Sequence, residues 1–262
     1  KFIHTWPSHP YEYLVEEIKQ RKWDNQSIGL EMDSHYFTAF CYKKIKIGLP
    51  DAKLKDSERL VNWIRFVKSD AEIDLMRIAS RITEKGMKTA LENINTGVRQ
   101  CDAVAEIQKS LIGGTPEFGG DYAGIVPMLP TGKGTSASHL TWTEEKFIKG
   151  EATIIELAGV YKKYHCPMAR TIILGEPDQK KIDTMKATNE ALDAGISEIK
   201  PGKTCDEVAQ KFWKVLDKYK IKKSSRTGYS IRIGYPPDWG EHTLNIQKGD
   251  KTILQPNVTF HM

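Results

Sequence analysis

One carboxylate in an apolar stretch is the first candidate for chemistry. Glu156 interrupts the run IIEL at 154–157, which has the branched apolar residues of a β-strand. A buried carboxylate without a partner is costly, so Glu156 indicates either a catalytic group or a structural ion pair with Arg170. A carboxylate and a histidine with well separated pKa values can activate water and protonate a leaving nitrogen. Acid–base hydrolysis is thus one chemistry that this chain could perform.

Three further residues could take part in acid–base chemistry. His139 ends a loop of small residues at 130–139, where a histidine is either functional or a capping or solvent-facing residue. Glu241 and His242 are neighbours in a proline-containing loop at 236–242, which we expect to be rigid. The 130–139 loop contains glycines and a lysine, but it lacks the G-x-x-x-x-G-K-[ST] spacing of a phosphate-binding loop. Phosphate binding is therefore disfavoured there.

The elements that must position these residues are predicted from apolar patterns and turn residues. The stretch 154–175 has the pattern of a β-hairpin and carries both Glu156 and Arg170. Three more strands are predicted, at 122–128, 226–235 and 252–262. Loop 236–242 would then connect the last two strands.

An internal repeat predicts two related halves. The sequence IDLM at 73–76 is matched by IDTM at 182–185, and CDAVA at 101–105 is matched by CDEVA at 205–209. Each copy has the pattern of a long helix, a turn, a second helix and strand-like sequence, so we predict a duplicated ααβ unit with approximate two-fold symmetry. A pocket between two such halves is the expected place for a ligand.

A domain boundary is predicted near residue 66. Residues 1–66 suggest a partial α/β domain, and residues 67–262 the main domain. Ser69 and Glu72 have the spacing of a capping box, which predicts a helix from about 71 to 93. The elements predicted in the first domain are helices at 11–22 and 35–42 and strands at 27–31 and near 53–56. Because this domain opens abruptly, we expect part of it to precede this sequence.

Composition excludes several other classes of protein. The 262 residues are 39% hydrophobic and 28% charged, as in ordinary globular domains, and the net charge of +5 comes from scattered lysines. No basic block with interleaved aromatics indicates nucleic-acid binding, and no apolar run reaches the roughly 18 residues of a membrane span. The four cysteines form no CxxC pair, which favours reduced thiols and a cytoplasmic location.

The predicted hairpin resembles that of the pita-bread metallopeptidases, which include methionine aminopeptidase, Xaa-Pro aminopeptidase and prolidase. Their hairpin is typically D-x-G-x-x-x-x-G-Y-x-S-D-x-T-R-T, and its two Asp side chains hold a pair of divalent metal ions. Here the two Asp positions are occupied by Glu156 and Pro167, and the R-T pair by Arg170 and Thr171. The metal-binding histidine of the family's G-H-G-I-G strand is replaced by Tyr229. Proline has no side-chain oxygen, so the resemblance implies a pita-bread scaffold that has lost its dimetal centre.

The resemblance implies an α/β (α+β) pita-bread creatinase/aminopeptidase fold, in which a curved, mostly antiparallel sheet is covered by the duplicated helices. The family's remaining metal-binding Glu residues would lie beyond residue 262, so we expect the catalytic domain to be C-terminally incomplete here. Within the family, ELAGVYKKYHCPMART and GYSIRIGYPPDWGEHTLNI are most similar to the ectoine hydrolases, which are metal-free members that open a cyclic amidine. Arg232 departs from the family strand, which usually has Gly there.

Three functions follow from the resemblance. The expected one is a metal-independent hydrolase of a non-peptide C–N bond in a small cyclic amidine, with no cofactor. The second is an Xaa-Pro dipeptidase or aminopeptidase with two divalent metal ions. The third is a non-catalytic binding protein of the same fold. The implied partners are a small-molecule substrate and a second copy in a homodimer, with neither nucleic acid nor membrane.

The resemblance also suggests catalytic roles. Glu156 would pair with a cationic amidinium, His139 would shuttle the proton, and Tyr229 would donate a hydrogen bond to the tetrahedral intermediate. Glu241 and His242 would supply a second acid–base pair.

Substrate binding is expected at three further residues, which are Tyr122, Arg170 and Trp239. Trp239 could instead pack the loop that contains it, and Tyr229 equally fits a core aromatic. His165 is interpreted as structural.

Overall fold

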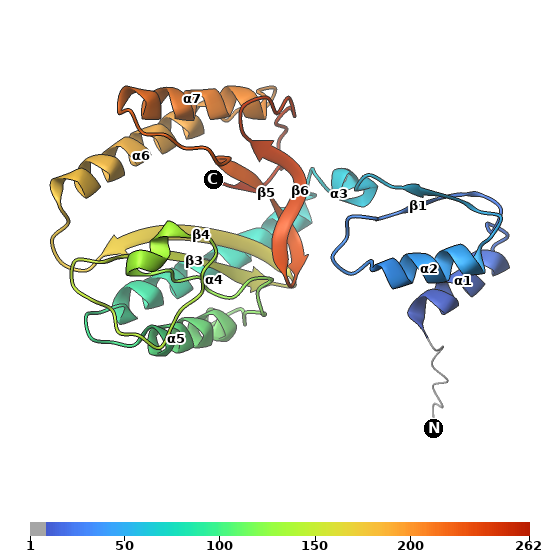
Figure 1. Ribbon diagram of the computed structural model, residues 1–262, viewed down its shortest axis with the longest axis horizontal. Coiled ribbons are helices and arrows are strands. Elements are labelled where there is room, and N and C mark those ends of the chain that lie inside the picture. Colours follow the sequence, from blue (N-terminus) through green and yellow to red (C-terminus); the bar gives the residue numbers. More distant parts are fainter. Residues whose placement is uncertain (1–8) are drawn as a thin grey trace. The chain divides into compact units, whose positions relative to one another are not determined.

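The computed structural model describes residues 9–262, which divide into two compact units, one ending at Ile64 and the other running from Arg65 to Met262. The first unit contains α1 (Pro10–Gln20), β1 (Ser27–Leu30), α2 (Ala39–Gly48), β2 (Lys53–Asp56) and α3 (Leu60–Ile64). Strands β1 and β2 pair in parallel, and the helices α1 and α2 pack together (Figure 1). A small apolar core of Val15, Leu30, Ile45 and Leu49 holds this unit together.

The helix predicted at 35–42 is shifted along the sequence. Helix α2 begins at Ala39, because the hydroxyl of Thr38 accepts a hydrogen bond from the backbone N–H of Cys41 and caps the helix there. The helix predicted at 11–22 and the strand at 27–31 are confirmed within two residues by α1 and β1.

The second unit combines one five-stranded antiparallel sheet with two pairs of helices (Figure 1). Its helices are α4 (Asp70–Asn93), α5 (Gln100–Gly113), the 3₁₀ helix η1 (Gly132–Ser136), α6 (Gln179–Glu198) and α7 (Cys205–Lys218). Its strands are β3 (Ala152–Tyr161), β4 (Tyr164–Ile173), β5 (Gly228–Tyr235), β6 (Asp238–Ile246) and β7 (Phe260–His261). The strand order is β3-β4-β5-β6, with β7 paired to β5, and the pairs are antiparallel.

The duplicated sequence motifs correspond to two helix pairs. Helices α4 and α5 pack together over β3, whereas α6 and α7 pack together with α7 against β6 (Figure 1). Each pair has its own apolar cluster, one centred on residues such as Ile107 and Leu157 and the other on Phe212 and Leu244. The predicted ααβ repeat is thus visible in the packing.

The predicted capping box starts α4. The backbone N–H of Ser69 donates to the carboxylate of Glu72 at 2.9 Å, and the N–H of Glu72 donates back to the Ser69 hydroxyl at 3.4 Å. A cap of this kind stabilises a helix by about 1 kcal/mol. It fixes where the long helix that covers β3 begins.

Helix α4 crosses β3 very closely at Gly159. The N–H of Gly159 donates to the Thr83 hydroxyl at 3.0 Å. A Cβ at position 159 would lie 2.3 Å from the backbone nitrogen of Thr83, so only glycine fits there. This contact fixes the distance between β3 and α4 at the point where they cross.

The predicted hairpin is confirmed, and its turn is short. Strands β3 and β4 pair from Ala152↔Ile173 to Tyr161↔Tyr164. Lys162 and Lys163 connect them with φ values of 47° and 67°, as in the two-residue turns that match strand twist.

Two strand predictions and one loop prediction are wrong. Residues 122–128 form no strand, because their backbone is held by other partners, such as the His165 ring that accepts the N–H of Gly124. The loop predicted at 236–242 is only the two-residue turn Pro236-Pro237, after which β6 begins at Asp238. The strand predicted at 252–262 is reduced to β7, since Pro256 lacks a donor and Asn257 has a φ of 64°.

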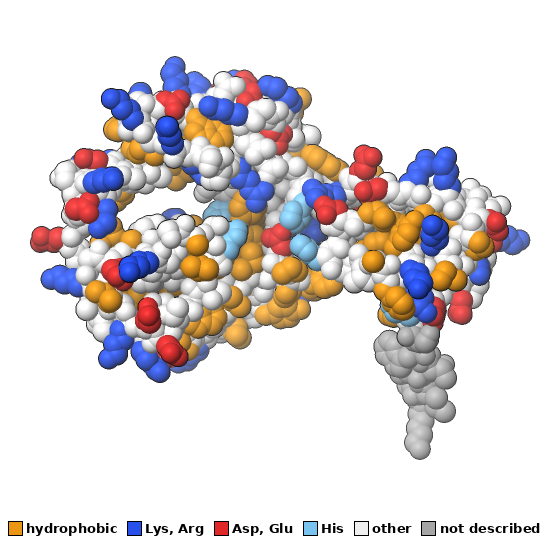
Figure 2. Space-filling view, viewed as in Figure 1, with side chains coloured by type: hydrophobic (Ala, Val, Ile, Leu, Met, Phe, Trp, Pro, Cys, Tyr) orange, Lys and Arg blue, Asp and Glu red, His pale blue; other side chains and the backbone are white. Residues whose placement is uncertain are grey.

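Two surface properties of the described residues bear on partners. No helix among residues 9–262 is long and apolar enough to cross a membrane. On the face drawn in Figure 2, Lys and Arg side chains over α6 and α7 are interspersed with Asp and Glu.

Candidate active site

Four strands of the same sheet bring four side chains together. Glu156 lies on β3, Tyr229 on β5, Trp239 on β6 and His261 on β7. Tyr229 and His261 are direct cross-strand partners, and their rings meet edge-to-face at 5.5 Å. We call these four residues the Glu156 cluster.

Tyr229 is the centre of the hydrogen bonds in this cluster. Trp239 Nε1 donates to Tyr229 Oη at 2.9 Å, and His261 Nδ1 lies 3.2 Å from the same oxygen. The Tyr229 hydroxyl also acts on the Glu156 carboxylate and lowers its pKa. His261 Nδ1 lies 3.8 Å from Glu156 Oε1, and both side chains are largely buried, with 14% and 18% of their surface exposed.

Burial shifts the pKa of each titratable group in the cluster in the direction that favours the neutral form of the group. It raises the pKa of Glu156, although the charge of His139 and the hydrogen bond from Tyr229 oppose this. Burial, together with the nearby Glu156 charge, raises the pKa of Tyr229 to about 12. Burial and the charge of Arg170 lower the pKa of His261 to about 4.

These shifts define what the cluster can do at neutral pH. Tyr229 keeps its proton and can donate a hydrogen bond, and His261 is uncharged. The carboxyl group of Glu156 lies in surroundings that disfavour an unpaired negative charge, so a bound cation would stabilise its charged form. The site combines one acidic group for a cation with hydrogen-bond donors for a developing oxyanion.

His139 belongs to the surroundings of Glu156. It is exposed, it has a φ of 62°, and its charge acts on the Glu156 carboxylate. The segment that leads to His139 pairs with β3 at two isolated bridges, Met128↔Glu156 and Thr131↔Thr153.

Arg170 does not form the ion pair that was the alternative explanation for Glu156. The register places Arg170 opposite Ile155, whose side chain points to the other face of β3. Arg170 is exposed and donates to the carbonyl of Ala169 at 2.7 Å. It acts on the cluster through its charge, which reaches His261.

Glu241 and His242 are not a pair, because neighbouring residues on β6 point in opposite directions. Glu241 is fully buried, and its carboxylate accepts a hydrogen bond from the buried Lys68 ammonium at 2.7 Å. Burial raises the pKa of Glu241 and lowers that of Lys68, so desolvation outweighs their mutual attraction. This arrangement gives Glu241 a structural place in the core.

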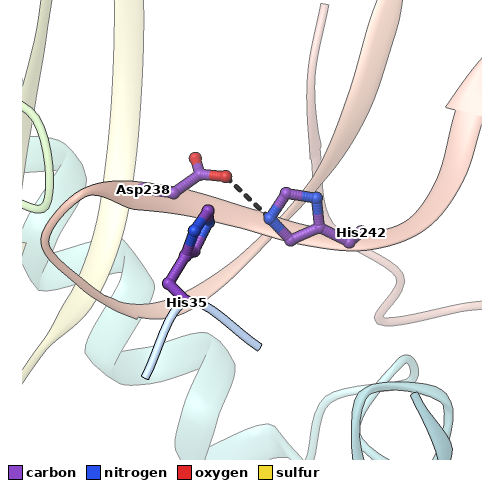
Figure 3. Close-up of side chains that lie close together, drawn as sticks. All are labelled: His35, Asp238 and His242. Atoms are coloured by element: carbon purple, nitrogen blue, oxygen red, sulfur yellow. Dashed lines mark ion pairs between the residues drawn. The ribbon is translucent and has the colours of Figure 1, made fainter. Parts of the chain in front are cut away.

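His242 is on the exposed side of β6 and contacts Asp238. Its Nε2 lies 2.7 Å from the Asp238 carboxylate (Figure 3). Burial raises the pKa of Asp238, but the hydrogen bond from His242 and the backbone N–H groups of Gly240 and Trp239 outweigh it and lower the pKa to about 2. The two residues therefore form a charge-assisted contact.

The two remaining aromatic candidates lie in different surroundings. Trp239 is fully buried and acts on the cluster through its hydrogen bond to Tyr229. Tyr122 is half exposed and lies next to Lys163, whose ammonium is 3.1 Å from the centre of the ring. The structure does not bring Tyr122 into the Glu156 cluster.

His165 is a buried structural residue, as its sequence position suggests. Its Nδ1 bonds to the carbonyl of Lys163 at 2.8 Å, and its Nε2 accepts from the N–H of Gly124 at 2.7 Å. With both ring nitrogens used by backbone groups, it has no free nitrogen for substrate.

His261 is the site residue that sequence reasoning missed. Its only signal was a histidine between two apolar residues, Phe260 and Met262, in strand-like sequence. Its role depends on pairing between β5 and β7, which local patterns do not reveal.

The donor atoms present do not fit a dinuclear metal centre. Such a centre needs several oxygen ligands around two ions about 3.5–4 Å apart. Glu156 is the only carboxylate in its cluster, and Pro167 stands opposite Ala158 without any ligand atom. Among residues 9–262, Glu156 belongs to no group of three or more ligand atoms close enough to share an ion.

Comparison with known proteins defines the family. Residues 74–262 match metallopeptidase family M24, so the chain belongs to this family. The prolidase structure from Pyrococcus furiosus covers 95% of the chain and 69% of its own length with a TM-score of 0.79 at 19% identity, which shows the pita-bread fold.

Within the family, the chain is similar to an enzyme of small-molecule metabolism. It is 43% identical to ectoine hydrolase from Halomonas elongata over 267 residues, which is 99% of this chain and 67% of the relative. It is 22% identical to Xaa-Pro dipeptidase from Pyrococcus furiosus over 226 residues, covering 81% of this chain and 63% of that relative. The chain thus spans about two thirds of the length of these enzymes, and the prediction that it is a hydrolase of this family is confirmed.

Proposed function

We propose that the chain is the catalytic part of a metal-independent hydrolase that opens a C–N bond in a small cyclic amidine, with ectoine as the first candidate substrate. The observation that carries this proposal is the Glu156 cluster, in which one carboxylate is combined with a neutral histidine and a phenol. The 43% identity to ectoine hydrolase supports the choice of substrate.

The residues of the cluster suit the steps of amidine hydrolysis. Glu156 binds the cationic amidinium, whose carbon is already electrophilic. Water adds to this carbon, and Tyr229 donates a hydrogen bond to the oxygen of the tetrahedral intermediate. His139 takes the proton that water loses and returns it to the ring nitrogen whose bond to the same carbon then breaks.

Substrate recognition follows from charge. Arg170 would attract a carboxylate on the substrate through its positive charge, which reaches as far as His261. Trp239 contributes by holding Tyr229 in place. Tyr122 would contact the substrate only at the edge of the site, since its ring is occupied by Lys163.

The test is hydrolysis of ectoine by the intact protein, followed by proton NMR. We expect ring opening of ectoine and no cleavage of Xaa-Pro dipeptides. Glu156→Gln should lower kcat/KM by at least about 100-fold, because the amidinium loses its negative partner in a largely buried site. The matched control is Glu84→Gln, which removes an exposed carboxylate on α4 that pairs with Lys88. Cleavage of the dipeptides without ring opening of ectoine would contradict the proposal and favour the peptidase alternative.

We further propose that the protein is a cytoplasmic homodimer with reduced cysteines. Light scattering of the intact protein measures the oligomeric state. A monomeric mass at micromolar concentration would contradict the dimer.

A further inference from the structure

We infer that His261 is a positioning residue, which donates a hydrogen bond from Nδ1 to Tyr229 and thereby directs the single proton of Tyr229 toward Glu156. This inference rests on the proposed function for its catalytic meaning. Neither the family resemblance nor the sequence pattern pointed to His261.

The donors and acceptors around Tyr229 Oη indicate the tautomer of His261. Trp239 Nε1 can only donate, so Tyr229 accepts at 2.9 Å. His261 Nδ1 lies 3.2 Å from the same oxygen and 3.8 Å from Glu156 Oε1, so a hydrogen on Nδ1 would face two oxygen acceptors. The single proton of Tyr229 is then left for the Glu156 carboxylate, whose pKa the phenol lowers. The neutral tautomer of His261 with hydrogen on Nδ1 satisfies all three contacts at once.

The surroundings of His261 keep it neutral. The charged and titratable groups that act on it are Arg170 from β4, Glu156 from β3 and Tyr229 from β5. Burial and the positive charge of Arg170 lower its pKa to about 4. At neutral pH, His261 therefore serves as a hydrogen-bond donor without adding a positive charge that would compete with a cationic substrate for Glu156.

The consequence for the reaction is a preorganised phenol. With two donors, Trp239 and His261, on its oxygen, Tyr229 can only present its own proton outward, toward Glu156 or toward the oxygen that forms on the substrate. Such fixed donors lower a barrier because they need no reorganisation during the reaction. Removing His261 would leave the phenol free to turn.

The kinetic test uses two amides in place of the imidazole in the intact protein. The side-chain amide of His261→Asn can reach the position of Nδ1, whereas that of His261→Gln reaches the position of Nε2. With ectoine as substrate, we expect His261→Gln to lower kcat roughly tenfold with little change in KM, which corresponds to one neutral hydrogen bond. His261→Asn should recover most of this loss. In a Tyr229→Phe background, His261→Gln should have no further effect.

Equal losses in the two single variants, or a further loss in the Tyr229→Phe background, would overturn the inference. A second measurement uses NMR of the wild-type protein, so it depends neither on enzymatic activity nor on the folding of a variant. In the wild-type protein labelled with ¹⁵N-histidine, the His261 ring should have hydrogen on Nδ1 at pH 7. Hydrogen on Nε2 alone would overturn the inference. If the wild type fails to open ectoine, the proposed function fails and the NMR result decides the role of His261 by itself.

Discussion

The buried ion pair between Lys68 and Glu241 makes a quantitative prediction about stability. Both side chains are almost completely buried, and the ammonium lies 2.7 Å from the carboxylate. Lys68→Met keeps the length of the side chain but removes its charge, so Glu241 must either stay charged in the core or take up a proton. Breaking a buried pair in this way typically costs about 3–5 kcal/mol.

Protonation sets the upper limit of this cost. A carboxyl group with an ordinary pKa of 4.5 pays about 3.4 kcal/mol to be protonated at pH 7, at 1.36 kcal/mol for each pH unit. The limit falls to zero near pH 4.5, so Lys68→Met should cost less as the pH decreases. In Glu241→Gln, Lys68 must lose its proton instead, and from an ordinary pKa of 10.5 the limit is about 4.8 kcal/mol at pH 7. This second cost should decrease as the pH increases.

The assay is urea unfolding of the intact protein followed by tryptophan fluorescence from pH 5 to pH 9. The two variants should have pH dependences of opposite sign relative to wild type. The double variant Lys68→Met with Glu241→Leu should recover much of the lost stability, because no charge remains in the core. Lys88→Met, which breaks an exposed pair with Glu84, is the control and should change little. Equal costs at all pH values in both single variants would refute this reasoning.

Three further predictions concern the core and the site. Burial lowers the pKa of His165 in the folded protein to about 4, from an ordinary 6.5. Its contribution to the free energy of unfolding is therefore fully present above pH 6.5, and about 3 kcal/mol is lost as the pH falls to 4. The unfolding free energies of wild type and His165→Gln should differ in slope across this pH range, and parallel curves would contradict the assignment. Gly159→Ala places a Cβ 2.3 Å from the backbone nitrogen of Thr83 and should lower the free energy of unfolding in urea by about 1–3 kcal/mol. An unchanged midpoint of urea unfolding would show that α4 can move away from β3. Tyr229→Phe should lower kcat for ectoine about 10- to 100-fold. It should also destabilise the protein by about 1–3 kcal/mol, because the buried Trp239 N–H loses its acceptor. An unchanged kcat would leave Tyr229 as a core aromatic.

Local features of the fold were predictable from the sequence. The capping box at Ser69 and Glu72 needs only residues three positions apart, and the hairpin of β3 and β4 is closed by a two-residue turn. The α4–α5 and α6–α7 pairs were predictable because the sequence carries the same motif twice. In each case the determining contacts lie close together in the chain.

The features that could not be predicted depend on distant contacts. Glu241 and its partner Lys68 are 173 positions apart, so a buried structural carboxylate had the same local appearance as a catalytic one. His261 reaches Tyr229 only through the pairing of β7 with β5. Residues 122–128 have the composition of a strand, but their backbone bonds elsewhere, as at Gly124 with His165.

The central claim is that this member of family M24 hydrolyses its substrate without the family's metal ions. The most direct measurement is the rate of ectoine hydrolysis by the intact protein after exhaustive chelation, with the bound metal determined by elemental mass spectrometry on the same sample. We predict an unchanged rate at substoichiometric metal. A rate that is lost on chelation and restored by Mn²⁺ or Co²⁺, with two ions bound per chain, would contradict the account.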